Sequence, residues 1–132
     1  MKITADTNVL LRLIVRDDLP QLTKAKMALD AAEIVCIATA TLCELAWVLG
    51  RTYRHPNQNI SAAIRALLGS ANVVCNRAAV DAGLALLDAG GDFADGVMAF
   101  DGSTLGGDEF LSFDKEAVRL LSNQGVSARL LA

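Results

Sequence analysis

Short apolar runs rich in β-branched residues alternate with longer segments of helical period along the whole chain. Strands separated by helices are joined by right-handed crossovers, which produce a mainly parallel sheet covered by helices on both faces. The pattern therefore predicts an α/β fold with three layers, α/β/α, around a mainly parallel central sheet of four or five strands. The predicted strands are residues 2–5, 34–37, 73–75 and 110–113, with 126–131 as a possible fifth.

The segments between these strands keep apolar residues at helical spacing. Pro20 stands in a predicted first turn, where proline is tolerated because the first amide groups of a helix have no partner. Asn76 and Asp92 stand where N-caps are expected. The predicted helices are residues 7–16, 20–32, 41–53, 60–68, 77–87, a segment after Asp92 that carries Asp95, and 115–122.

The length of 132 residues predicts a single domain over residues 1–132, since domains cluster at about 100 to 150 residues. Apolar residues make up 53% of the sequence, more than a small domain usually hides, which indicates a protein partner. The longest nearly uncharged run, 34–49, falls short of the about 20 residues that cross a bilayer. Asp6 arrives before a signal-peptide apolar region could develop, so we expect a cytoplasmic protein without membrane association.

The net charge of −3 gives no general attraction to nucleic acid, so binding of any polyanion would need a local cluster of basic side chains. An ordinary solvated face is the alternative for these residues. The candidates are Arg12, Arg16, Lys24, Lys26, Arg51, Arg54 and His55.

Several chemistries lose support because their residues are missing. The single histidine is too little for a His-based zinc centre, and the three cysteines, in apolar surroundings without the paired spacing of zinc or redox sites, are predicted core thiols. The glycine-rich residues 102–106 are not followed by the Lys and the Ser or Thr that complete a phosphate-binding loop. Ser103 has no Gly-x-Ser-x-Gly frame around it.

Four carboxylates follow predicted strands or lie near the starts of the helices after them. Ligands of parallel sheets collect at the carboxyl ends of the strands. Carboxylates gathered there repel one another unless they are protonated or meet a divalent metal, and oxygen ligands without histidine suit Mg²⁺ or Mn²⁺. The pattern indicates a metal site that hydrolyses phosphodiesters, with one ion or two, formed by Asp6, Glu44, Asp95 and Asp114.

Each carboxylate also has a purely structural interpretation. Asp114 and Asp92 would cap the helices that follow them, and residues 41–44 (Thr-Leu-Cys-Glu) match a capping box. Asp95 lies in a first helical turn, where the helix dipole favours a negative charge. Glu44, however, is flanked by apolar residues, and a carboxylate in apolar surroundings needs a cation or hydrogen bonds. Taken together, the four acids favour the metal site.

Four segments, in this order, resemble the motifs of PIN-domain ribonucleases, and most of all those of VapC-type toxins of bacterial toxin-antitoxin pairs. The resemblance covers essentially the whole chain and implies a PIN-like fold. Residues 96–107 depart from it, because they carry glycines where relatives have a more alanine-rich helix, which questions the rigidity of that helix. The four segments are residues 5–10 (Ala-Asp-Thr-Asn-Val-Leu), 43–49 (Cys-Glu-Leu-Ala-Trp-Val-Leu), 92–95 (Asp-Phe-Ala-Asp) and 110–115 (Phe-Leu-Ser-Phe-Asp-Lys).

The resemblance implies a toxin that is a metal-dependent endoribonuclease and hydrolyses RNA with a metal-activated water. Asp6, Asp95 and Asp114 would then hold Mg²⁺, or Mn²⁺, and Glu44 would bind a second ion or position the water. Asn8 and Ser112 match polar positions that orient the acids. A homodimer and a small antitoxin that wraps the toxin are also implied. The candidate contacts to the RNA backbone are Arg12, Arg16, Arg51 and Arg54.

Two other classes of function stay open. An α/β phosphatase or receiver-like domain would also gather acids at strand ends, but residues 6–8 (Asp-Thr-Asn) lack a second Asp and no acidic pair precedes Asp6. A catalytically silent PIN-like binding module would keep the fold without turnover. The presence of all four acids argues against this second alternative.

Overall fold

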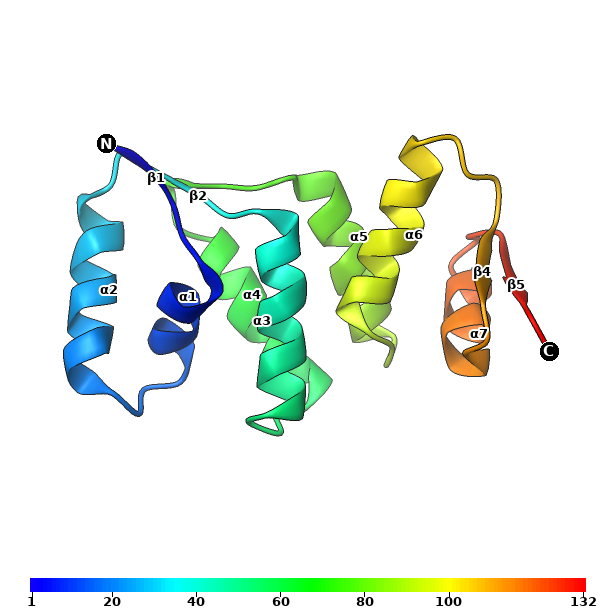
Figure 1. The fold of residues 1–132 in the computed structure, drawn as a ribbon, viewed down its shortest axis with the longest axis horizontal. Helices are drawn as coiled ribbons and strands as arrows, with labels where there is room; N and C mark the ends of the chain where they lie inside the picture. The colour runs from blue at the N-terminus through cyan, green and yellow to red at the C-terminus, as the bar shows by residue number, and fades with distance from the viewer. The chain divides into compact units, whose positions relative to one another are not determined.

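The computed structural model describes residues 1–132, and the chain divides into two units, Met1–Asn76 and Arg77–Ala132. The colour gradient of Figure 1 follows the chain through the first unit, from β1 to β3, and then through the second, from α5 to β5. Each unit is described by itself below.

The first unit contains a three-stranded parallel sheet in the order β1-β2-β3. Val35, in the middle strand, lies opposite Ile3 on one side and Val73 on the other, and is 1% exposed. A strand paired on both sides and covered by helices is apolar throughout, as the sequence of β2 is. The strands are β1 (Lys2–Thr4), β2 (Ile34–Cys36) and β3 (Val73–Val74).

Four helices complete the first unit. Asp6 and Asp18 cap α1 and α2. Pro20 lies in the first turn of α2, as the sequence predicts. α3 turns one apolar face to the core and leaves the opposite face exposed. The helices are α1 (Thr7–Ile14), α2 (Leu19–Ala31), α3 (Thr39–Arg51) and α4 (Asn57–Leu68).

The second unit contains three helices and a pair of parallel strands. Phe110 lies opposite Ala128, and both pack against a core cluster that joins α5, α6 and α7. The cluster consists of Leu86, Ala99, Leu120 and Leu121. The elements are α5 (Arg77–Asp88), α6 (Phe93–Thr104), β4 (Phe110–Ser112), α7 (Lys115–Asn123) and β5 (Ala128–Leu130).

Two glycines allow α5 and α6 to pack against each other, side by side in Figure 1. A Cβ atom on Gly83 would lie 2.6 Å from a ring carbon of Phe93, which is fully buried. A Cβ atom on Gly96 would lie 2.5 Å from the carbonyl oxygen of Ala82. Real Cβ contacts are longer, so both positions require glycine for this packing. The glycines within α6, Gly96 and Gly102, do not interrupt this helix, which continues to Thr104.

The expected α/β class with parallel strands is confirmed, and the elements are consistent with the three-layer arrangement expected from the sequence. The prediction of one sheet with four or five strands is wrong, because β4 pairs with β5 in a separate two-stranded sheet. Strands of two or three residues make few hydrogen bonds to a neighbouring strand. Their sequences therefore predict where a strand lies, but not which other strand it pairs with. The assignment of residues 1–132 to a single domain stays a prediction.

No helix of the structure combines the length and the apolar character that crossing a membrane requires. The three cysteines are half-buried rather than in the core.

Candidate carboxylate site

In the second unit, the negative charges of Asp92 and Asp114 act on Asp95, and the three carboxylates are called the Asp95 cluster. Asp95 is half-buried in the first turn of α6. Its pKa is raised, first because burial disfavours the charged form and then because the negative charges of Asp92 and Asp114 lie nearby. The cluster therefore favours a proton or a cation at Asp95.

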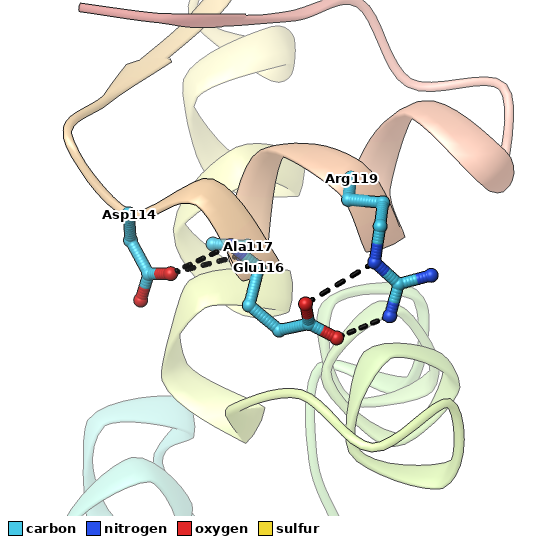
Figure 2. A network of polar contacts seen from close by, with 4 residues as sticks. All are labelled: Asp114, Glu116, Ala117 and Arg119. Atoms are coloured by element: carbon cyan, nitrogen blue, oxygen red, sulfur yellow. Dashed lines mark hydrogen bonds and ion pairs between the residues drawn. The ribbon is translucent and has the colours of Figure 1, made fainter. Parts of the chain in front are cut away.

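The two outer members of the cluster are helix caps, as their structural interpretation predicted. Oδ2 of Asp92 accepts a hydrogen bond from the backbone N–H of Asp95 at 3.2 Å. Oδ1 of Asp114 accepts from the N–H groups of Glu116 at 2.9 Å and Ala117 at 3.2 Å, as Figure 2 shows. Each cap uses one carboxylate oxygen, so the other oxygen stays available for a ligand.

Ser112, one of the two predicted supporting residues, contacts the backbone of Asp114. Its Oγ accepts a hydrogen bond from the Asp114 N–H at 3.0 Å. The contact fixes the short connection between β4 and α7, so Ser112 holds the residue that caps α7. Its assignment as a supporting residue of the site stays a prediction.

An ion pair between Glu116 and Arg119 lies beside the cap of α7 (Figure 2). The hydrogen bond from Arg119 lowers the pKa of Glu116, and the same contact raises the pKa of Arg119. Both groups stay ionised and neutralise each other. The pair therefore adds no net charge beside Asp114.

Asp6 caps α1 in the first unit, where its Oδ1 accepts a hydrogen bond from the N–H of Val9 at 3.0 Å. It also lines an open pocket of about 340 Å³, called the Asp6 pocket. Asn8 and Arg12, both predicted site residues, line the same pocket. The assignments of Asp6, Asn8 and Arg12 as site residues stay predictions. The complete lining is Asp6, Asn8, Val9, Arg12, Gln21, Lys24, Ala25 and Ala28.

Arg12 contributes positive charge to the wall of the Asp6 pocket. Its side chain is 20% exposed and donates to Oδ1 of Asp17 at 2.9 Å. Its Nε is buried without a hydrogen-bond partner. Part of its charge is therefore already committed to Asp17. Lys24, on α2, is exposed and adds a second cation to the same wall.

Glu44 is exposed, so the expectation that it lies in apolar surroundings is wrong. The helical period turns sequence neighbours to different faces: Leu42 and Leu45 are fully buried while Glu44 points away from them. The capping box is wrong as well. α3 begins at Thr39 with Ala38 as its N-cap residue, so residues 41–44 lie inside the helix.

The other predicted RNA contacts, Arg16, Arg51 and Arg54, also belong to the first unit. Arg16 lines a second pocket, of about 320 Å³, with Lys26. Arg51 is exposed, and its guanidinium carbon lies 5.8 Å from the centroid of the Trp47 ring. Arg54 is exposed and adopts a left-handed conformation with φ 58°. The assignment of these arginines as contacts to the RNA backbone stays a prediction.

The four predicted acids are divided between the units. Asp6 and Glu44 belong to the first, and Asp95 and Asp114 to the second, so their convergence in one site stays a prediction. No group of three or more His, Cys, Asp or Glu side chains in the structure is arranged to hold a metal ion. The donors present nevertheless fit a hard cation, because the Asp95 cluster offers carboxylate oxygens only.

Sequence reasoning missed two residues that the structure places beside predicted ones. Gln21 lines the Asp6 pocket, and no pattern in the sequence of α2 would have identified it. Trp47 shares an exposed helix face with Glu44 and Arg51. Their spacing of three and four residues, which places side chains on one face of a helix, could have revealed that face.

The family model described as the PIN domain matches residues 3–120. Proteins of this family are generally nucleases and generally use divalent metal ions. No curated protein matches the chain.

Proposed function

Because the chain belongs to the PIN-domain family, we propose that it is a metal-dependent endoribonuclease, the toxin component of a bacterial toxin-antitoxin pair. The observation that carries the proposal is the environment of Asp95. This half-buried carboxylate has a pKa raised by burial and by the charges of Asp92 and Asp114. Perturbed carboxylates of this kind are concentrated at functional sites, and a cation relieves their repulsion.

Mg²⁺, or Mn²⁺, is the proposed cofactor, held by Asp95 and Asp114 together with Asp6. The oxygens of Asp6 and Asp114 that are not used in caps are available for this role. A divalent ion, when bound, lowers the pKa of an attacking water and offsets charge that develops on the phosphoryl oxygens. Glu44, which is exposed, would orient that water or bind a second ion.

The Asp6 pocket is the proposed contact for the RNA backbone. Lys24 and Arg12 supply positive charge there, and Asn8 supplies a neutral donor and acceptor. Lys24 is exposed and forms no ion pair, so its charge is available to a phosphate. Because the whole chain is acidic, such a local contact is what its binding of RNA requires.

The experiment is cleavage of total bacterial RNA by the purified protein in Mg²⁺, compared with EDTA. Asp95→Asn is expected to lower the rate by at least about 100-fold, because it removes a ligand whose charge the site needs. Asp101→Asn, an exposed substitution on the same helix, is the matched control and should cleave like the wild type. Cleavage that persists in EDTA, or in Asp95→Asn, would reject the proposal. A phosphatase substrate tested in parallel distinguishes a nuclease from the alternative, an α/β phosphatase.

The proposal includes a homodimer and an antitoxin partner. Large apolar side chains left on the outside support a protein partner: Leu105 is 88% exposed and Phe113 is 78% exposed. Light scattering of the purified protein tests the dimer. Growth arrest on expression, relieved by the product of a neighbouring gene, tests the antitoxin. Expression without growth arrest would reject the toxin role. The nuclease activity would still be decided by the RNA cleavage assay.

A further inference from the structure

The indole ring of Trp47 is exposed to solvent. It is 56% exposed on α3, although a side chain of this size usually buries most of its area. A single exposed aromatic residue needs no explanation by itself. Here, however, a cation lies over its ring: the guanidinium carbon of Arg51 is 5.8 Å from the ring centroid.

The two side chains belong to a continuous exposed face of α3, which we call the α3 stripe. Its members recur at the spacing of three and four residues that stacks side chains along a helix. The opposite face of α3 is the one that enters the core, through Leu42, Leu45 and Leu49. Packing within the first unit therefore does not account for the stripe. The stripe consists of Ala40, Glu44, Trp47 and Arg51, all exposed.

The charges of the stripe favour one kind of occupant. Arg51 forms no ion pair, so a protein surface laid over Trp47 would have to desolvate an unpaired guanidinium. A nucleotide offsets this cost, because its phosphate pairs with the guanidinium while its base stacks on the indole. Single-stranded RNA presents bases that are free to stack, whereas a duplex keeps them inside.

We propose that Trp47 and Arg51 form a stacking platform for one nucleotide of a single-stranded RNA substrate, on the same helix face as Glu44. The inference rests on the proposed nuclease function, since Glu44 is one of its assigned acids. It adds a specificity element: the enzyme would select unpaired RNA segments through the indole. Trp47 and Arg51 position the substrate and take no part in the chemistry.

Trp47 is the only tryptophan of the chain, so its fluorescence reports directly on the platform. A ten-nucleotide single-stranded RNA, titrated into the wild type in EDTA to prevent cleavage, is expected to quench this fluorescence. The matching RNA duplex should quench it much less. The emission of the free protein should stay at the wavelength of a solvated indole over a wide range of protein concentration.

Variants separate stacking from general attraction, with affinity measured by the anisotropy of a labelled RNA. Trp47→Ala is expected to bind about 5- to 100-fold more weakly, and Trp47→Phe should recover most of the loss. Arg51→Ala should weaken binding and reduce the slope of log K against log salt by about 0.7. Met27→Ala, which removes another exposed apolar side chain, and Arg65→Ala, which removes one charge from α4, are the controls.

The outcomes distinguish the platform from the proposed function. If RNA is cleaved in Mg²⁺ but leaves the fluorescence unchanged, and Trp47→Ala binds like the wild type, the platform is wrong and the nuclease stands. Quenching by single strands without any cleavage would support the platform and reject the nuclease. A blue shift that grows with protein concentration, in the absence of RNA, would mean that a second copy covers Trp47 and would overturn the platform.

Discussion

Asp92 caps the helix that carries Asp95, and at the same time its charge opposes the charge of Asp95. One oxygen of Asp92 accepts a hydrogen bond from the N–H of Asp95 at 3.2 Å. Its negative charge is among the causes that raise the pKa of the Asp95 carboxyl. The same residue therefore stabilises α6 and destabilises the ionised form of its neighbour, which is an arrangement that a bound cation would relieve.

The first prediction concerns stability without metal. The pKa of Asp95 is raised above its ordinary value of 3.8, so the folded protein binds this proton more tightly than the unfolded chain does. The free energy of unfolding therefore falls as the pH rises from that value through the raised pKa, and it stays lower above it. Asp95→Asn removes the effect, and in EDTA at pH 7 it should melt at a higher temperature than the wild type.

Thermal unfolding in EDTA across pH 3 to 8 checks this expectation. The difference between the two proteins should disappear at the acidic end, where the wild-type carboxyl is protonated in both states. Mg²⁺ should raise the melting temperature of the wild type more than that of the variant. A variant that is less stable than the wild type at pH 7 in EDTA would contradict the prediction.

The second prediction concerns the packing of α5 against α6. Gly96→Ala places a Cβ 2.5 Å from the carbonyl oxygen of Ala82 and should destabilise the fold by about 1 to 3 kcal/mol. Gly102→Ala is the matched control on the same helix, because a Cβ there meets nothing within 4 Å. It should stabilise by about 0.5 to 1 kcal/mol. Urea denaturation measures both, and equal effects would rule out the packing explanation.

The third prediction separates the two roles of Asp114. Asparagine caps helices about as well as aspartate, so Asp114→Asn should keep the hydrogen bonds to Glu116 and Ala117 and nearly wild-type stability. Asp114→Ala loses the cap and should be destabilised by about 0.5 to 2 kcal/mol. Both variants should lose Mg²⁺-dependent cleavage. If Asp114→Asn cleaves RNA normally, this residue is a cap and not a metal ligand.

The fourth prediction concerns Ser112. Ser112→Ala leaves the N–H of Asp114 without its acceptor and should destabilise by about 0.5 to 1.5 kcal/mol. Ser122→Ala, at an exposed position near the end of α7, should change stability by less than about 0.5 kcal/mol. Chemical denaturation of the two variants gives the comparison. Wild-type stability in Ser112→Ala would mean that water replaces the lost contact.

Local features of the fold followed from the sequence because they depend on neighbouring residues. Asp6 and Asp114 were placed directly after strands and at helix starts, and both are found there as caps. The helix that begins at Phe93 was predicted from Asp92 as its cap. Capping and helical period act over a few residues, so a single sequence contains the necessary information.

Features that depend on distant residues were predicted less well. The pairing of β4 with β5 could not be predicted from strands of three residues each. The apolar pattern of so short a strand is compatible with several partners and registers. The exposure of Glu44 was missed because its sequence neighbours are apolar, although neighbouring residues of a helix lie on different faces. Gly96 was taken as a weakness of α6, although it is the position at which α5 approaches most closely.

The ring of Phe93 occupies the space that any side chain at position 83 would need. A larger side chain at position 83 therefore requires a smaller one at position 93, and a substitution at position 83 alone lowers the stability of the fold. Gly83→Ala combined with Phe93→Leu should be tolerated better than Gly83→Ala by itself. Libraries that aim to change α6, the helix of Asp95, should therefore randomise positions 83 and 93 as a pair.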